Sequence, residues 1–157
     1  MKLVISAIIS VILFIAMSGC ANSHDDEAKM AIGEVKATTL LQAYPSFEHS
    51  YQAFNLSEKD KSSIALWPDD LRIEVFFGSW CHDSQREVPR FLKILEQKKL
   101  STRLIGLNYQ KIDPAGLAAA ADIKFTPTFV IYRNNQEIGR IVERPKASLV
   151  TDIDEML

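Results

Sequence analysis

The feature of this sequence that most constrains its fold is a buried strand that runs through a short turn into a cysteine and then into a helix. Residues 71–77 alternate between apolar and polar and then become fully apolar, as a strand entering a buried sheet does. Gly78 and Ser79 turn the chain, and Cys81 follows Trp80. The helix expected after the cysteine carries apolar residues on one face, at Val88, Phe91, Leu92 and Leu95. This order predicts a cysteine at the start of a helix that packs on a sheet.

The remaining apolar segments continue an alternation of strands and helices. A second strand is expected at Thr102–Leu107, and Asp113-Pro114 supplies an N-cap and first-turn pair for an alanine-rich helix that runs to about residue 121. Strands at Phe129–Tyr132 and Ile138–Val142 flank an Asn-Asn turn and predict a hairpin. A closing amphipathic helix is indicated by Leu149, Val150, Ile153 and Met156. The predicted order from residue 71 onward is βαβαββα.

These segments resemble the thioredoxin superfamily. Trp80-Cys81-His82-Asp83-Ser84 is similar to its Trp-Cys-x-x-Cys active-site loop, with serine in place of the second cysteine. Pro89, eight residues after Cys81, matches the proline that kinks the active-site helix of thioredoxins. Thr126-Pro127-Thr128, just before a strand, resembles the cis-proline segment of the family. The resemblance covers residues 71–157 and implies an α/β, thioredoxin-like fold with a central mixed β-sheet flanked by helices.

A helical extension is expected on the N-terminal side of this core, so that the domain spans residues 38–157. Its apolar residues recur at steps of four and three, at Leu40, Tyr44, Phe47, Tyr51 and Phe54. The helix is expected to break or kink near Pro45. Ser57 caps a further short helix that ends before Trp67-Pro68. The aromatic stripe indicates a contribution to the core rather than a ligand site.

The first residues have the pattern of a secretion signal. Lys2 precedes an uncharged, predominantly apolar run, Leu3–Met17, and small residues lead to Cys20. This segment resembles the signal peptide and lipobox of a bacterial lipoprotein, which implies removal of residues 1–19 and lipidation of Cys20. The alternative is an uncleaved membrane anchor, but the run is shorter than the roughly 20 residues that a spanning helix needs. Residues 20–37 would then be the lipidated cysteine and a polar, flexible tether.

The residue after Cys20 indicates the cellular location of the protein, and the charge of the chain indicates the class of its partners. Ala21 stands where lipoproteins retained in the inner membrane of enteric-type bacteria carry aspartate. The resemblance therefore implies a lipid anchor in the bacterial cell envelope, in the outer membrane facing the periplasm. The formal net charge of the chain is −2 and its basic residues are scattered, so nothing indicates a nucleic-acid partner.

Cys20 and Cys81 are the only cysteines of the chain. Disulfides persist in exported proteins, yet a lipidated Cys20 leaves Cys81 without an intramolecular partner. An odd thiol in an exported protein indicates intermolecular pairing or reactivity. The competing interpretation is an inert buried thiol, since free cysteines are often core residues. The neighbouring Trp80 favours an exposed, reactive loop.

The expected chemistry follows from the position of Cys81 at a helix N-terminus. Unsatisfied N–H groups and the positive end of the helix dipole lie there, and both favour the thiolate, which attacks disulfides and sulfenic acids. Ser84, one turn along, is expected to donate a hydrogen bond to the sulfur. A protonated His82 would add to thiolate stabilisation, and Asp83 would oppose it.

The family resemblance also implies a substrate-binding segment. Thr126, before a cis Pro127, would offer its backbone N–H and C=O groups to an extended substrate, and Trp80 would give an apolar surface beside it. The alternative for Pro127 is an ordinary trans proline at the start of a strand. Val75 stands where thioredoxins carry a buried aspartate that assists the resolving cysteine, and Glu74 points to the opposite face of its strand. Losing both the second thiol and its proton acceptor argues against an ordinary dithiol reductase or oxidase.

The sequence thus predicts an envelope-anchored, thioredoxin-like monothiol protein in thiol–disulfide exchange, with Cys81 as nucleophile in isomerisation, deglutathionylation or reduction. Expected partners are disulfide- or thiol-containing envelope proteins, glutathione or another small thiol, and the membrane through the lipid anchor. The alternative is a redox-inactive thioredoxin-fold binding module that holds a partner segment. No cofactor or metal is expected, because one cysteine and scattered histidines give no metal-ligand spacing. Arg86, Glu87 and Arg90 are expected to form a solvated helix face.

Overall fold

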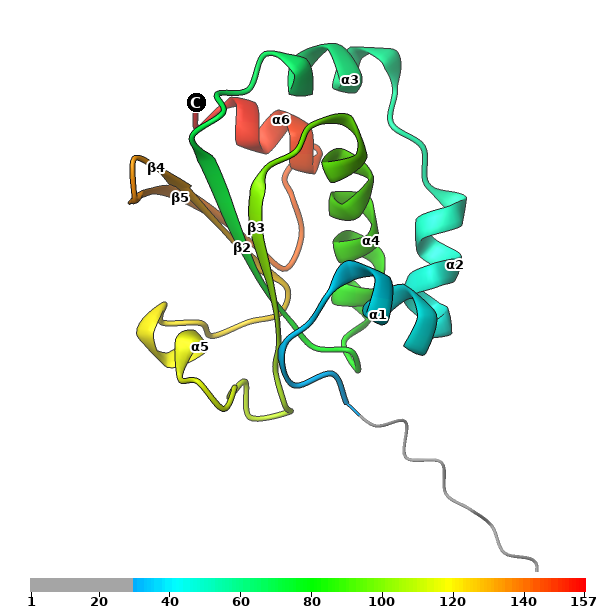
Figure 1. Cartoon of the computed structure of the whole chain (residues 1–157), viewed down its shortest axis with the longest axis vertical. Coiled ribbons are helices and arrows are strands. Elements are labelled where there is room, and N and C mark those ends of the chain that lie inside the picture. Colours follow the sequence, from blue (N-terminus) through cyan, green and yellow to red (C-terminus); the bar gives the residue numbers. More distant parts are fainter. Residues whose placement is uncertain (1–29) are drawn as a thin grey trace, which may run out of the picture.

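The computed structural model describes residues 30–157, which build a five-stranded sheet with helices on both faces (Figure 1). The elements are, in chain order, β1 (Gly33–Glu34), α1 (Ala37–Ala43), α2 (Pro45–Ala53), α3 (Glu58–Ala65), β2 (Leu71–Phe77), α4 (His82–Gln97), β3 (Ser101–Gly106), α5 (Leu117–Ala120), β4 (Thr128–Arg133), β5 (Gln136–Val142) and α6 (Leu149–Asp154). The strand order is β1-β3-β2-β4-β5, in which β2 and β3 are parallel and all other neighbours antiparallel. The predicted mixed sheet and the βαβαββα order from residue 71 are confirmed.

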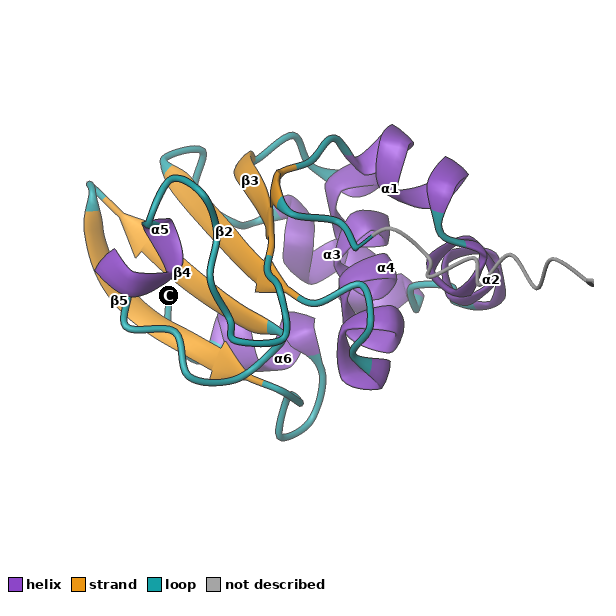
Figure 2. Ribbon diagram, turned by 90° about the horizontal axis from the view of Figure 1, so that it is seen from below, coloured by secondary structure: helices purple, strands orange, loops and turns teal. Residues whose placement is uncertain are grey.

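The two faces of the sheet bury separate apolar clusters, as β2 illustrates. Val75 and Phe77 belong to the larger cluster, together with residues of α1–α4 and α6, whereas Phe76 belongs to a smaller cluster with residues around α5. Successive side chains of a strand point to opposite faces, which explains this division. Figure 2 shows α5 apart from the other helices.

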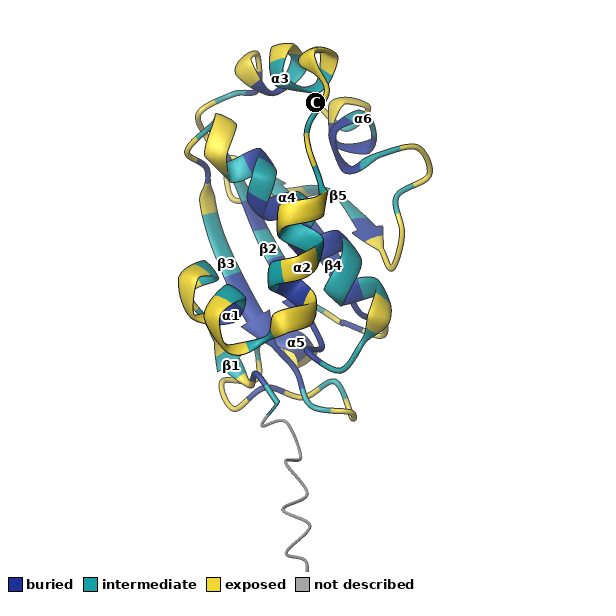
Figure 3. Ribbon diagram, turned by 90° about the vertical axis from the view of Figure 1, so that its right-hand side faces the viewer, coloured by how far each residue is buried: buried dark blue, intermediate teal, exposed yellow. Residues whose placement is uncertain are grey.

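The helical extension is confirmed, and its break falls where proline requires it. Pro45 is the first residue of α2, where its missing N–H costs nothing, and Tyr44 between α1 and α2 is extended. Phe47 is fully buried, and α2 lies along α4 with its exposed side outward (Figure 3). Ser57 caps α3 in a capping box with Asp60, in which each side chain accepts the other residue's backbone N–H at 3.1 Å.

The chain joins the fold earlier than the predicted tether allows. The tether was expected to reach residue 37, but Gly33–Glu34 pairs with β3 and Ala31 is buried. Gly106 makes this possible, because a Cβ on it would lie 2.3 Å from the carbonyl oxygen of Ala31. The predicted signal peptide, Cys20 and the first part of the tether lie outside the described residues. Within residues 30–157, no helix has both the length and the apolar character needed to span a membrane.

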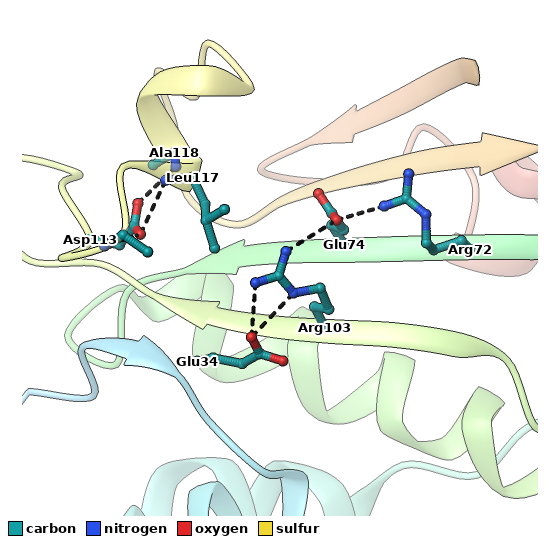
Figure 4. Close-up of polar contacts among 8 residues, drawn as sticks. Glu34, Arg72, Glu74, Arg103, Asp113, Leu117 and Ala118 are labelled. Atoms are coloured by element: carbon teal, nitrogen blue, oxygen red, sulfur yellow. Dashed lines mark hydrogen bonds and ion pairs between the residues drawn. The ribbon is translucent and has the colours of Figure 1, made fainter. Parts of the chain in front are cut away.

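The helix predicted from Asp113-Pro114 begins later, at Leu117. The Asp113 side chain accepts the backbone N–H groups of Ala115, Leu117 and Ala118 at 2.8–3.1 Å, so that it closes the turn before α5 and also accepts the first two N–H groups of that helix (Figure 4). Gly116 then enters α5 with a φ of 71°, a conformation that glycine adopts without strain. The result is a fixed loop between β3 and a single-turn helix.

Candidate functional site

The end of β2 delivers Cys81 to the start of α4, as predicted. The Cys81 N–H donates to the Gly78 carbonyl at 3.0 Å, which closes the turn, and Cys81 is the N-cap residue of α4. The residue is partly exposed and its thiol is free in the described part of the chain. The interpretation of Cys81 as a buried core thiol is therefore not supported.

The Thr126–Pro127 peptide bond is cis, which confirms the prediction and excludes the trans alternative. The Cys81 thiol donates to the Thr126 carbonyl across 3.1 Å, so two segments distant in sequence meet at the sulfur. The Glu143 N–H donates to the Pro127 carbonyl at 2.7 Å and ties this segment to the end of β5. A backbone carbonyl thus lies directly beside the one thiol of the site.

Ser84 occupies the expected place one turn along α4 but makes a different contact. Its side chain is fully buried, and its Oγ accepts the Gly78 N–H at 3.2 Å. Among residues 30–157, no hydrogen bond joins Ser84 to the sulfur, so the predicted bond between them is not formed. The hydroxyl points back into the turn that holds Cys81, whereas the sulfur points toward the cis-proline segment. Ser84 therefore fixes the shape of the turn.

The Trp80 side chain packs on the turn and on the segment that follows β3. Its Nε1 donates to the Leu107 carbonyl at 3.1 Å, and its ring covers Gly78 so closely that a Cβ there would lie 2.6 Å from the indole. The Tyr109 ring lies against the indole with a centroid separation of 4.8 Å and is 60% exposed. Tyr109 therefore shares the apolar surface that was predicted for Trp80 alone. Its only sequence signal is an aromatic residue shortly after the end of a strand.

The two residues between Cys81 and Ser84 differ in their surroundings. His82 is exposed. Asp83 accepts from Arg86 at 2.8 Å and from Arg144 at 3.0 Å. Burial acts to raise the pKa of Asp83, but the hydrogen bonds and charges of these two arginines outweigh it and hold the pKa below its usual value. The Asp83 charge is therefore compensated locally, which weakens its predicted opposition to a thiolate.

Glu87 corrects the prediction of a solvated helix face. Its side chain is only 2% exposed, and its Oε1 accepts from Arg86 at 2.6 Å and from Arg90 at 3.1 Å. It lines a pocket with residues of the segment after α2 and of the loop before α6. Arg86 and Arg90 remain partly exposed and cover the buried carboxylate of Glu87. This face of α4 is therefore not a fully solvated stripe.

The position beneath the active-site loop is apolar. Val75 is fully buried, whereas Glu74 lies on the other face of β2, paired with Arg72 at 2.6 Å and with Arg103 at 3.7 Å (Figure 4). Arg103 also pairs with Glu34 at 2.8 Å. The carboxylate next in sequence is thus engaged on the opposite face, as predicted. Within the described chain, no group of three or more His, Cys, Asp or Glu side chains could hold a metal ion.

Comparison with known proteins bears on the family and the fold of the chain. A family profile described as thioredoxin matches residues 35–153. The thioredoxin-like protein R548 of Acanthamoeba polyphaga mimivirus is 29% identical over 80 residues, which are 51% of this chain and 58% of the viral protein. The chain therefore matches little more than half the length of that relative.

Two solved structures share the fold at low identity. One is PA1234, a protein of unknown function from Pseudomonas aeruginosa, with a TM-score of 0.58, 18% identity and coverage of 75% of this chain and 76% of that chain. The other is an HIV epitope scaffold, with a TM-score of 0.56, 19% identity and coverage of 78% and 81%. These likenesses concern the fold alone. Because the family profile spans most of the sequence, including the Cys81 turn and the cis-proline, the chain belongs to the thioredoxin family.

Proposed function

We propose that this protein is an envelope-anchored monothiol protein that exchanges disulfides through Cys81. The observation that carries the proposal is the position of the sulfur, partly exposed at the N-cap of α4 and 3.1 Å from the Thr126 carbonyl beside a cis proline. Membership of the thioredoxin family supports a redox role. The anchor rests on the sequence pattern that ends at Cys20.

The exchange proceeds in two balanced steps. The Cys81 thiol loses its proton to solvent, and the thiolate attacks one sulfur of a substrate disulfide. The substrate S–S bond breaks, a mixed disulfide forms, and the departing sulfur leaves as a thiolate that takes up a proton. A second thiol then attacks the mixed disulfide and releases Cys81. If a different thiol of the substrate attacks the substrate sulfur, the result is isomerisation. If Cys81 has taken glutathione from a glutathionylated substrate, a second glutathione attacks the bound glutathione sulfur, and oxidised glutathione leaves. Reduction of a protein disulfide consumes two small thiols: the first releases Cys81 and leaves a disulfide between the substrate and the small thiol, and the second reduces that disulfide.

The neighbouring groups have distinct roles in this proposal. Thr126 and Pro127 present main-chain groups to an extended substrate segment, and Trp80, packed against Tyr109, gives an apolar surface near it. Deprotonation of Cys81 ends its hydrogen bond to the Thr126 carbonyl, which is then free to accept an N–H from the substrate. Ser84 holds the turn in shape, and His82 stabilises the thiolate when it is protonated.

A second candidate is a redox-inactive binding module that holds a partner segment in the same groove. One observation favours it. Within the described residues, the sulfur accepts no capping hydrogen bond from α4, and the Ser84 hydroxyl is engaged with Gly78. Under this alternative, partner binding does not depend on the thiol.

Recovery of a scrambled protein substrate tests the exchange activity. The full chain is incubated with a protein that carries non-native disulfides, in the presence of glutathione, and regain of native pairing is followed over time. We expect wild type to accelerate recovery and Cys81→Ala to match the uncatalysed rate. Equal rates for the two proteins would overturn the exchange proposal. Complexes captured from solubilised envelopes, indifferent both to reductant and to Cys81→Ala, would then favour the binding module.

A further inference from the structure

Exposed apolar side chains gather at the end of the domain that carries Cys81. Seven large hydrophobic residues are exposed within residues 30–157. Five of them form what we term the apolar rim: Ile32, Tyr109, Ile112, Phe125 and Val142, which are 40–60% exposed. The topology places them together, because β2 and β3 end here, β4 begins here, and Thr128 of β4 pairs with Val142 at the end of β5. The other two, Leu66 and Leu157, lie toward the opposite end, near the start of β2 and the C-terminus (Figure 1).

The N-terminal segment joins the fold at this same end. The Ala31 N–H donates to the Ser79 Oγ at 3.0 Å, two residues before Cys81, and the Ala31 backbone crosses Gly106 at the end of β3. Ile32, a rim residue, belongs to this segment. The rim is therefore continuous with the part of the chain that leads back toward Cys20.

The segment that connects Cys20 to the apolar rim is short. Nine residues separate Cys20 from Met30. A fully extended chain spans at most roughly 3.5 Å per residue, so Cys20 lies within about 35 Å of Met30, where the segment joins the fold. A lipid on Cys20 would keep the Cys81 end close to the bilayer surface.

We propose that the apolar rim docks on the lipid bilayer that carries the anchor, so that Cys81 works at the membrane surface. The inference rests on the anchoring in the proposed function. Aromatic and apolar side chains on a protein surface partition into the headgroup region, and Tyr and Trp favour this position because one part of the side chain is apolar and the other polar. Tyr109 packs against Trp80, which precedes Cys81, and Phe125 precedes Thr126, whose carbonyl accepts the Cys81 thiol.

Two ion pairs in the same loops lower the cost of docking for the charges they contain. Lys124 pairs with Asp122 at 2.6 Å, and Arg144 pairs with Asp83 at 3.0 Å. Paired charges lose less free energy than isolated ones on approaching a surface of low dielectric constant. Disulfides that reach Cys81 in this orientation are those of proteins held at, or attached to, the same membrane.

Tryptophan fluorescence offers a direct test, because one tryptophan lies near each end of the folded domain. Trp80 lies at the rim, whereas Trp67 is buried and bonded through Nε1 to Asp154 at 2.6 Å. β2 separates the two ends by about 20 Å. The full-length sequence is expressed in a bacterium, and the protein extracted from its membranes is reconstituted in phosphatidylethanolamine–phosphatidylglycerol vesicles with brominated acyl chains, which quench tryptophan only on close approach. We expect quenching of wild type that is lost in Trp80→Phe, which retains Trp67.

Matched variants connect the quenching to the rim. The double variant Tyr109→Ser, Ile112→Ser is expected to reduce quenching to the level of Trp80→Phe, and Leu66→Ser, at the other end, to leave it unchanged. A chain that floats with the vesicles without quenching would overturn docking while anchoring stands. A chain that does not float would overturn anchoring and docking together, and leave the chemistry of Cys81 to its own assay. Unchanged quenching with slower exchange on a protein disulfide in the double variant would assign the rim to protein substrates and overturn the proposal.

Discussion

At the scale of single residues, the serine that stands in place of a second cysteine, Ser84, has a structural role in the Cys81 turn. Ser84 is fully buried and accepts the Gly78 N–H, so its hydroxyl satisfies a backbone donor inside the turn that positions the thiol. A buried N–H without a partner is costly. Ser84 therefore supports the position of Cys81 without contacting the sulfur.

Replacement of this serine tests its structural task. Ser84→Ala leaves the buried Gly78 N–H without an acceptor, and we expect the free energy of unfolding to fall by about 1–3 kcal/mol. Urea denaturation followed by circular dichroism measures the change. Ser62→Ala is the control, because Ser62 Oγ donates to a carbonyl on an exposed part of α3, and we expect a loss within about 0.5 kcal/mol. Equal losses for both variants would contradict the assigned role of Ser84.

At the scale of elements, the loop between β3 and α5 depends on the carboxylate of Asp113. Burial acts to raise the pKa of Asp113, but the backbone N–H groups of Ala118, Leu117 and Ala115 outweigh it and hold the pKa below its usual value. The group is therefore more acidic folded than unfolded. Its contribution to stability is fully present above the unfolded value of about 3.9 and is lost as the pH falls through the lower folded value.

Asp113→Asn tests this contribution. We expect the variant to unfold at a lower urea concentration than wild type at pH 7. Its free energy of unfolding should be lower by about 1–2 kcal/mol, because a neutral amide accepts these N–H groups less strongly. The difference between the two proteins should shrink as the pH falls below 4. Asp69→Asn, at an exposed site, should change unfolding little at either pH. A difference between Asp113→Asn and wild type that stays constant down to the lowest pH would contradict the role of the charge.

Sequence patterns predicted the elements whose cause is local and missed those whose cause is tertiary. Alternation in β2, the proline break before α2, and the Asn134-Asn135 turn with φ of 51° and 61° are local, and each is found as predicted. Strand β1 has two residues, too few for a pattern, and depends on the close approach of Ala31 to Gly106.

The candidate site divides in the same way. Cys81 at the helix start follows from the strand–turn–helix pattern and the cis Pro127 from family resemblance, and the structure brings them together. The contacts of Ser84, the burial of Glu87 and the packing of Tyr109 on Trp80 depend on neighbours distant in sequence or on the direction of a side chain. A run of charged residues such as that around Glu87 predicts a solvated helix face. Its burial becomes evident only when the segments that pack over it, after α2 and before α6, are placed.

At the scale of the whole molecule, the two faces of the sheet are covered unequally. Helices α1–α3 join α4 and α6 over the larger cluster, and within residues 30–157 the other face has only α5. Beyond α5, that face carries a row of paired charges, Glu34, Arg103, Glu74 and Arg72 (Figure 4). The apolar rim lies at the end of the sheet, around Cys81, rather than on either face. Chemistry and membrane docking are therefore proposed for one end of the domain.

The most direct test of the central claim is the rate at which Cys81 forms a mixed disulfide with oxidised glutathione at pH 7, followed by mass spectrometry of the intact chain. The control is a peptide of residues 78–84, which has the same local sequence without the fold. If Cys81 is a nucleophile activated by its position, the folded chain reacts faster than the peptide, and added reduced glutathione releases the adduct. A folded chain that reacts no faster than the peptide would contradict exchange chemistry at Cys81.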